Sequence, residues 1–346
     1  MNHRRNCHAS ATRVLVRLSL LALALGASVT VQAADKEVTI AYQDMMVPWR
    51  YAQDIDELAK ATGYKVNYRK FGGGGDVIRA MASGNVQIGE AGSSPVASGL
   101  SQGLPIQIFW ILDNINDAEA LVARTGSGVD DVAMLRGKRL GVPFVSTSHF
   151  HALLALKQAG LSGKEVKVLN MRPPEIAAAW QRGDIDAAFT WNPVLSTLKA
   201  SGKVLTSSGK IAQQTGYATF DAIVVNTDWA KDHGPFMTAM VKILAKTDAD
   251  YRANAAAWTG ASAKGAAVAK VSGAAPDDVA PSMALYQFPT LAEQGSKRWL
   301  SGGKDSGVAK SLAATAQFLQ TQKTIQAVLP DYSIGVTDVW VKAAAK

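Results

Sequence analysis

The stretch KVNYRKFGGGGDVIRAMASGNVQIGEAGSSP, residues 65–95, shows the pattern that decides the fold. A β-rich run ends at Phe71, and a glycine-rich turn leads into a helical pattern from Asp76 to Ser83. A second apolar run, VQIGEAG, then ends at a Ser-Ser-Pro turn that starts another helix. Short β-rich runs that alternate with helical patterns predict parallel strands joined by helices.

The same alternation continues on both sides of this stretch. VTIAYQ (38–43) and a helix from Trp49 to Ala61 precede it. The strands expected after it are IQIFWIL, EALVAR, RLGVPF, VKVLNM, IDAAFTW, KVLTSS and FDAIVVN, with helices between most of them. Beyond residue 235 the chain is Ala-rich and helical. The sequence therefore predicts an α/β fold.

The strands fall into two sets. EALVAR (119–124) and FDAIVVN (220–226) bracket a compact block, and we expect the chain to cross between two lobes at these runs. Two crossings make a hinge. We assign residues 34–119 and 226–346 to lobe 1 and residues 120–225 to lobe 2. A ligand is expected between the lobes, at the carboxyl ends of strands.

The N-terminal 33 residues have the pattern of a secretory signal peptide. Four arginines and no acid precede an apolar run from Leu18 to Leu25, and small residues at 31 and 33 fit a cleavage site after Ala33. The run is shorter than the roughly 20 residues that a membrane-spanning helix needs. Cys7, the one cysteine in the sequence, falls in this segment. We expect an exported, periplasmic protein without disulfides.

The composition is that of a soluble globular protein, with 48% hydrophobic and 18% charged residues. Without the four arginines of the leader, 32 of the 36 basic residues remain against 28 acidic ones. The basic residues are scattered among acids, which argues against a nucleic-acid surface. We expect a monomer without nucleic-acid partners.

Two strand-to-helix turns carry hydroxyl groups. Gly92-Ser93-Ser94-Pro95 follows one strand, and Val145-Ser146-Thr147-Ser148 follows another. Free N–H groups and hydroxyls at helix starts bind anions. The alternative is that each serine caps its own helix. The candidate anion-binding residues are Ser93, Ser94, Ser146, Thr147 and Ser148.

Acids at strand starts are candidates for a cationic group. Glu119 begins the outgoing strand and Asp221 the returning one, whereas Asp44 and Asp117 are expected to be solvated on the surface. Trp191 ends a strand, where its indole could hold a cation over its ring or pack in the core. Trp49, Trp110 and Tyr217 are weaker candidates of the same kind.

The sequence shows no catalytic, metal or cofactor motif. The glycine-rich turn at 72–75 lacks the Lys-Ser or Lys-Thr of a phosphate loop. His149 and His151 are two apart on a predicted helix and so diverge, and no Gly-x-Ser-x-Gly elbow occurs. We expect no enzyme activity, cofactor or metal.

Four segments together resemble the taurine-binding components of ABC importers, within the wider family of aliphatic sulfonate, nitrate and thiamine-precursor receptors. They are RKFGGGGDVIRAMASGNVQIGEAGSSP, GKRLGVPFVSTSHFHALLALKQAG, VKVLNMRPPEIAAAWQRGDIDAAFTWNP and FDAIVV. The resemblance covers roughly residues 38–226. It implies a two-lobed periplasmic binding fold of type II that closes on its ligand and docks onto a membrane permease.

The resemblance also implies roles for individual residues. The turn hydroxyls would hold a sulfonate, Glu119, Trp191 and Asp221 would receive an ammonium, and Gln43 would lie close by. Segments 44–47, 114–118 and 215–218 depart from the usual family pattern. Two alternatives stay open: a receptor for another small anion or zwitterion, such as an alkyl sulfonate or aminophosphonate, and an enzyme on the same fold, such as a thiamine-pyrimidine synthase.

Overall fold

The structure, a computed structural model, describes residues 36–346 and contains two five-stranded sheets. The first sheet has the strand order β2-β1-β3-β10-β4 and the second the order β7-β6-β8-β5-β9. The first comprises β1 (Glu37–Tyr42), β2 (Lys65–Lys70), β3 (Ile88–Gly92), β4 (Ile106–Asn114) and β10 (Phe220–Asn226). The second comprises β5 (Glu119–Arg124), β6 (Arg139–Val142), β7 (Lys167–Asn170), β8 (Ala187–Trp191) and β9 (Gly202–Ser207). The predicted α/β fold in two lobes is confirmed.

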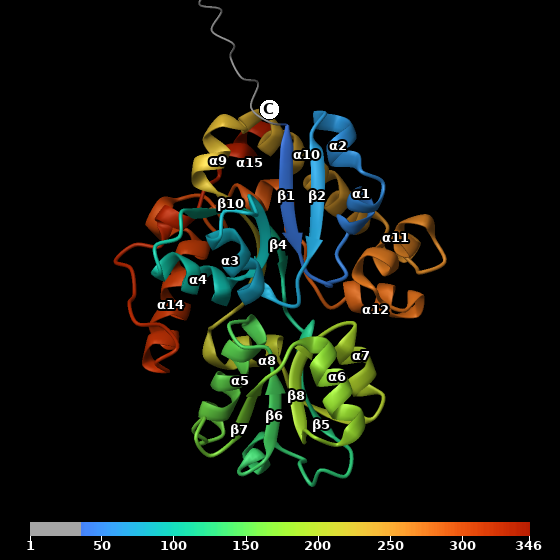
Figure 1. Cartoon of the computed structure of the whole chain (residues 1–346), viewed down its shortest axis with the longest axis vertical. Helices are drawn as coiled ribbons and strands as arrows, with labels where there is room; N and C mark the ends of the chain where they lie inside the picture. Colours follow the sequence, from blue (N-terminus) through green and yellow to red (C-terminus); the bar gives the residue numbers. More distant parts are fainter. Residues whose placement is uncertain (1–35) are drawn as a thin grey trace, which may run out of the picture. The chain divides into compact units, whose positions relative to one another are not determined.

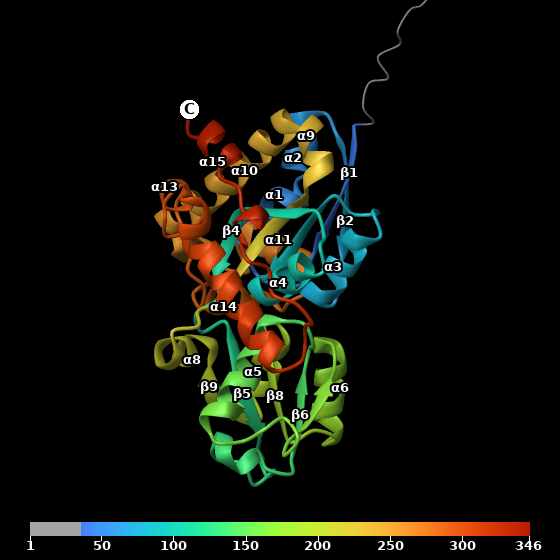
Figure 2. The same ribbon diagram turned by 90° about the vertical axis from the view of Figure 1, so that its left-hand side faces the viewer.

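Helices flank each sheet (Figure 1). The segments that carry the first sheet contain α1 (Arg50–Asp54), α2 (Glu57–Thr62), α3 (Gly74–Ala82), α4 (Ser93–Ser101), α9 (Thr227–Asp232), α10 (Gly234–Ala253), α11 (Ala263–Ser272), α12 (Val279–Met283), α13 (Leu291–Gln294), α14 (Gly307–Thr321) and α15 (Val339–Ala344). The second sheet is accompanied by α5 (Thr147–Gln158), α6 (Pro173–Arg182), α7 (Val194–Lys199) and α8 (Ser208–Thr215). Figure 2 shows α14 beside α4, which it contacts.

The expectation of parallel sheets is wrong for one strand in each sheet. β10 is antiparallel to β3 and β4, and β5 is antiparallel to β8 and β9, whereas the other pairs are parallel. β5 and β10 are the strands on which the chain enters each lobe from the other. Neither follows the crossover connection within one sheet that a parallel pair requires. The pattern of apolar residues predicts that these strands are buried, but it does not predict whether they run parallel or antiparallel to their neighbours.

Strand pairing locates the two crossings. β4 lies in the first sheet and β5 in the second, so the first crossing falls between Asn114 and Glu119. All of β10 pairs in the first sheet, so the second crossing comes before Phe220 and not after residue 225. The limits of the two lobes as folding domains stay a prediction.

Two helices differ from the expectation. The helix expected from Trp49 to Ala61 is broken into α1 and α2, because Asp56 adopts a left-handed conformation with φ of 52°. α8 occupies the segment between the expected strands KVLTSS and FDAIVVN, where Gly, Thr and Tyr residues favour a loop in the sequence. The Ser207 hydroxyl caps it by accepting a hydrogen bond from the Lys210 N–H.

Apolar residues from both sheets form the core. Leu121 and Ala123 of β5 face the large cluster, while Ala120 and Val122 face a smaller one under α6 and α7. Both faces of this strand are therefore buried, which explains why it reads as a continuous apolar run. Within residues 36–346 no helix is long and apolar enough to cross a membrane. The predicted signal peptide, residues 1–33, lies outside the described residues.

Candidate functional site

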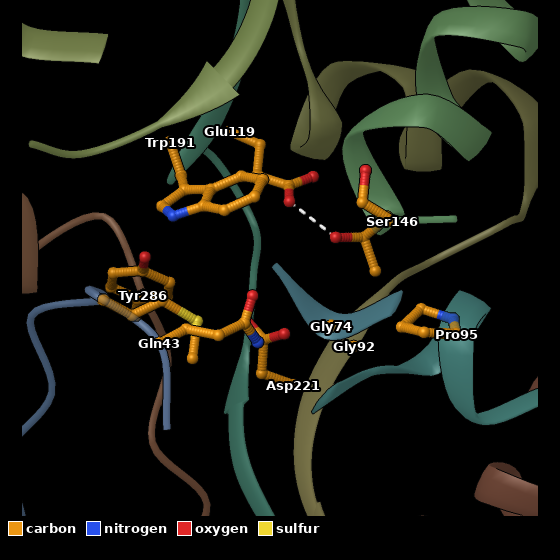
Figure 3. Close-up of a pocket in the computed structure, with 11 residues that line it drawn as sticks. Gln43, Gly74, Gly92, Pro95, Glu119, Ser146, Trp191, Asp221 and Tyr286 are labelled. Atoms are coloured by element: carbon orange, nitrogen blue, oxygen red, sulfur yellow. Dashed lines mark hydrogen bonds between the residues drawn. The ribbon is translucent and has the colours of Figure 1, made fainter. Parts of the chain in front are cut away.

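One cavity is lined by residues from both lobes (Figure 3). Its free volume is about 10 Å³, close to the space that one water molecule needs. The cavity is therefore too small for a ligand of several heavy atoms, which fits only when the lining side chains or the lobes move apart. The cavity is lined by Gln43, Met45, Gly74, Gly92, Pro95, Glu119, Ser146, Thr147, Trp191, Asp221 and Tyr286.

The starts of two helices, one from each lobe, meet at this cavity. α4 begins at Ser93, directly after β3, and α5 begins at Thr147 and contacts α4. The Ser146 hydroxyl caps α5 by accepting a hydrogen bond of 3.0 Å from the His149 N–H. The Ser93 hydroxyl is fully buried and has no hydrogen-bond partner within residues 36–346. Two positive helix ends at one cavity favour an anion there.

Gly92 allows this close approach. A Cβ atom at position 92 would lie 2.7 Å from the Thr147 methyl carbon Cγ2, 3.1 Å from Asp221 Oδ1 and 3.4 Å from Thr147 Oγ1. Any side chain at this position would therefore push against the opposite lobe. Glycine brings the hydroxyl of α5 and the carboxylate of β10 to the end of β3.

Glu119 is held by hydroxyl groups of its own lobe. Thr147 Oγ1 donates to Glu119 Oε1 at 2.5 Å, and Ser208 Oγ donates to Oε2 at 3.0 Å. The Ser148 hydroxyl lies near the same carboxyl but does not meet the geometry of a hydrogen bond. Burial raises the pKa of Glu119 to about 7, and these hydroxyls oppose the rise. The carboxyl group therefore titrates near neutral pH.

Asp221 lines the cavity from the start of β10, and Asp113 of β4 stands directly opposite it in the strand register. The register shifts between Asp221 and Ala222, a β-bulge of the kind often found beside functional sites. Both Asp113 oxygens are buried without a hydrogen-bond partner within residues 36–346. Burial, followed by the neighbouring carboxyl groups, raises the pKa of both acids well above the usual range.

The indole of Trp191 connects the two lobes. Its Nε1 donates to Asp44 Oδ1 at 2.7 Å, while Figure 3 shows its ring beside Glu119. Burial raises the pKa of Asp44, and the indole hydrogen bond opposes this rise. The expectation of a solvated Asp44 is therefore wrong in part, because the side chain is half-buried and bonded to Trp191 of the opposite lobe. Asp117 is exposed, as expected, and accepts a hydrogen bond from the Ser207 hydroxyl.

Residues 36–271 match the family described as the substrate binding domain of ABC-type glycine betaine transport systems. The chain is also 39% identical to the taurine-binding periplasmic protein of Escherichia coli strain K12 over 92% of its own length and 97% of that protein. The chain belongs to the substrate-binding proteins of ABC transport systems.

Solved structures show the same fold at low sequence identity. The periplasmic aliphatic sulphonate binding protein SsuA from Escherichia coli matches with a TM-score of 0.68 and 20% identity, over 87% of this chain and 92% of that one. The desulfurization enzyme DSZB matches with a TM-score of 0.59 and 14% identity, over 89% and 99% of the two chains. The fold is thus shared by binding proteins and at least one enzyme.

Six of the nine predicted site residues of this substrate-binding protein line the cavity: Gln43, Glu119, Ser146, Thr147, Trp191 and Asp221. The other three, Ser93, Ser94 and Ser148, are buried at the first turns of α4 and α5 without lining it. The structure therefore brings six of the nine predicted residues together at one cavity. Their roles toward a ligand stay a prediction.

A buried ion pair below the cavity was missed by the sequence analysis. Arg50 Nη1 and Nη2 donate to Glu90 Oε1 and Oε2, each at 2.6 Å, and both side chains are fully buried. Trp49 Nε1 donates to Glu90 Oε1 at 2.7 Å. Gln43 Nε2 donates to the Glu90 carbonyl at 3.2 Å, which orients the amide at the cavity. Glu90 inside an apolar strand was the available signal, because a buried charge needs a partner.

Tyr286 and Gly74 were also missed as lining residues. Tyr286 follows α12, in the helical segment where the sequence pattern carried no site signal. Gly74 starts α3, and a Cβ atom there would lie 2.7 Å from Pro95 Cγ. The glycine-rich turn thus lets α3 approach the start of α4.

A second cavity lies beside the first lobe's glycine-rich turn and contains an ion pair between the lobes. Arg172 Nε donates to Asp76 Oδ2 at 3.0 Å, and the two side chains line this cavity with Gly75 and Val145. Val145 has a φ of 54°, which is strained for a β-branched residue. A Cβ atom on Gly75 would lie 3.1 Å from Val145 Cβ, so the lobes touch here.

The histidines of α5 are engaged in packing and backbone contacts. His149 stacks on Phe144 with ring centroids 4.3 Å apart, and His151 Nε2 lies 2.9 Å from the Tyr217 carbonyl oxygen. Burial lowers the pKa of each histidine to about 4. Within residues 36–346 no group of three His, Cys, Asp or Glu side chains has the geometry to hold a metal ion.

Proposed function

We propose that this protein is the periplasmic receptor of an ABC importer, that it binds taurine or a related small sulfonate between its lobes, and that it delivers this ligand to a membrane permease. One observation carries the proposal: the starts of α4 and α5, one from each lobe, meet Asp221 at a single cavity, where Ser146 and Thr147 supply hydroxyl groups.

The chemistry of a sulfonate fits the helix starts. A sulfonate is anionic at every physiological pH and has three acceptor oxygens, so it suits backbone N–H groups and hydroxyls. The proposed donors are the first turns of α4 and α5 with Thr147 Oγ1. In the structure Thr147 donates to Glu119. Binding then requires the sulfonate to take over this hydroxyl while Glu119 turns to another partner.

The acids at the cavity fit a cationic group at the other end of the ligand. Taurine carries an ammonium two carbons from its sulfonate. Glu119 and Asp221 supply carboxyl groups, and the Trp191 ring supplies a face on which a cation is favourable. Because the two lobes contribute different parts of the site, a ligand that touches both stabilises the closed form. The closed form is the one that a permease would recognise.

A titration panel tests the proposal. Calorimetry with purified mature protein should show saturable binding of taurine, with weaker binding of ethanesulfonate and of an aminophosphonate. Sulfate serves as a control for a bare anion. Tighter binding of the aminophosphonate would move the proposal to the alternative ligand class. Absence of binding to every sulfonate would overturn it.

The enzyme alternative rests on the fold shared with a desulfurization enzyme. Incubation of the protein with bound sulfonate should return the ligand unchanged, as a receptor requires. Time-dependent release of sulfite or formation of any product would instead favour an enzyme. Reconstitution with the permease in vesicles tests delivery, because transport should depend on added protein.

A further inference from the structure

We propose that Asp113 and Asp221 act as one proton-holding pair, which makes a protonated amine with free N–H groups obligatory for tight binding and couples its binding to the release of a proton. This inference rests on the proposed function and deepens it. It defines the ligand class as aminoalkanesulfonates, and it assigns a role to Asp113, which does not line the cavity.

The geometry of two neighbouring strands carries the pair. Asp221 and Asp113 are directly opposite each other in the antiparallel register of β10 and β4, so their side chains lie on the same face of the sheet. Asp221 lines the cavity, while Asp113 is fully buried and does not. Neither Asp113 oxygen has a hydrogen-bond partner within residues 36–346.

An ionised carboxylate in this position would be buried without compensation. Burying an unpaired charge is costly, and two like charges on opposing residues add to the cost. The pKa values of both acids are raised, which agrees with this geometry. We infer that the pair holds at least one proton near neutral pH until a cation reaches it.

The surroundings offer little positive charge to relieve the pair. The charged and titratable groups that act on it are Arg50 of α1, Glu90 of β3, Glu119 of β5 and Asp248 of α10, with Tyr286 close by. Arg50 is the one cation in this set, and Glu90 already binds it in a bidentate pair. A cation supplied by the ligand is therefore the missing counter-charge.

The proton balance follows from these charges. An ammonium that reaches Asp221 stabilises its ionised form, so the carboxyl group loses its proton to the buffer. Affinity for taurine should then rise with pH between pH 5.5 and 7.5, by at most about tenfold per unit. Ethanesulfonate, which lacks the amine, brings negative charge only. Its affinity should fall or stay level over the same range, which is the opposite sign.

The amine must also present N–H groups. Carboxylate oxygens accept hydrogen bonds, which a primary ammonium can donate and a trimethylammonium cannot. We expect the N,N,N-trimethyl derivative of taurine to bind at least about tenfold more weakly than taurine, a difference of about 1.4 kcal/mol. Equal affinities would contradict the need for N–H donors.

The experiment is calorimetry at pH 7 in several buffers of different ionisation enthalpy, none of which contains a sulfonate group. Wild-type protein should release about one proton per taurine, whereas ethanesulfonate should release none or take up protons. Asp113→Asn removes the partner acid of the pair, so the number of protons released per taurine should fall below half of the wild-type value. Asp248→Asn is the matched control: it replaces another buried acid, which does not line the cavity and acts on Asp113 less than Asp221, Glu119 and Glu90 do, so it should change the proton count less than Asp113→Asn.

Each outcome decides the inference. Equal proton release by wild type and Asp113→Asn, or no release by wild type on taurine binding, overturns it while the proposed function stands. Wild-type protein that binds no sulfonate overturns both. Thermal unfolding checks that Asp113→Asn folds. If it does not, the opposite pH slopes of taurine and ethanesulfonate in wild type decide, and equal slopes overturn the inference.

Discussion

At the scale of single residues, the acids around the cavity have distinct surroundings although all are buried. Glu119 accepts hydrogen bonds from two hydroxyls, Glu90 is neutralised by Arg50, and Asp113 has no partner within the described residues. Asp221 alone combines exposure to the cavity with a neighbouring unpaired acid. Its substitution should therefore affect the ligand's cationic group more than the anion.

Asp221→Ala should weaken taurine binding by about 1 to 3 kcal/mol, because the ammonium loses its carboxylate partner. Ethanesulfonate binding should change less, since this ligand has no ammonium. Calorimetry with both ligands measures the difference. Equal losses would show that Asp221 supports the site in general and does not contact the cation.

Arg50→Met should destabilise the fold by about 3 to 5 kcal/mol, because it leaves the Glu90 carboxylate buried without its partner. The double substitution Arg50→Met, Glu90→Met should recover most of this loss. Urea unfolding followed by circular dichroism measures both. Lys231→Met, at an exposed ion pair with Asp228, is the control and should cost less than about 1 kcal/mol. Equal losses in the single and double variants would contradict this account.

At the scale of secondary-structure elements, the site is the junction of β3 with α4 against the start of α5. Strand ends and helix starts place backbone N–H groups at one point, and glycine at position 92 removes the side chain that would separate them. The contact between the lobes thus requires a residue without a Cβ atom at position 92, in addition to the hydroxyl groups.

Gly92→Ala should weaken binding of every sulfonate by about tenfold or more, because its methyl group meets the Thr147 methyl at 2.7 Å. Thr147→Ser removes that methyl and keeps the hydroxyl. The double variant Gly92→Ala, Thr147→Ser should therefore bind more tightly than Gly92→Ala alone. Titration of both variants with taurine tests this. If the double variant binds no more tightly than Gly92→Ala, the steric clash lies elsewhere, such as at Asp221 Oδ1.

At the scale of the whole molecule, the buried acids link stability to pH. The raised pKa of Glu119, about 7, means that the folded state binds a proton that the unfolded state has lost between roughly pH 4.5 and 7. The folded state is therefore stabilised at low pH in this window and loses that stabilisation as pH rises through 7. Asp113 and Asp221 act in the same direction.

Unliganded protein should be more stable at pH 5 than at pH 7.5 by about 1 to 3 kcal/mol. Glu119→Gln should reduce this difference, because a glutamine side chain does not titrate. Urea unfolding at the two pH values measures the effect. A protein that is equally stable at both would show that these acids are already ionised in the folded state.

The ion pair between Arg172 and Asp76 tests closure separately from chemistry. It is partly exposed, so its contribution should be at most about 1 kcal/mol. Arg172→Ala should weaken taurine and ethanesulfonate by the same factor, no more than about fivefold, because the pair joins the lobes without touching the cavity. A selective loss of one ligand, measured by calorimetry, would contradict a role in closure alone.

The sequence by itself determined the elements and much of the site. Alternating apolar runs and helical patterns placed the strands, because burial on both faces leaves a continuous apolar signal. Ser146 and Thr147 were recognisable from the capping pattern, and Glu119 and Asp221 from their places at strand starts. Each of these signals involves residues that are close together in the sequence, so the sequence alone is sufficient to predict them.

The tertiary structure alone decided the rest. It set the strand direction of β5 and β10, the hydrogen bond from Trp191 to Asp44 and the pairing of Arg50 with Glu90, all of which join residues far apart in the chain. In the sequence Asp113 is a single polar residue at the end of a strand. Only the strand register shows that it lies opposite Asp221. Such contacts depend on which surfaces pack together, and packing between distant segments leaves no periodic pattern in the sequence.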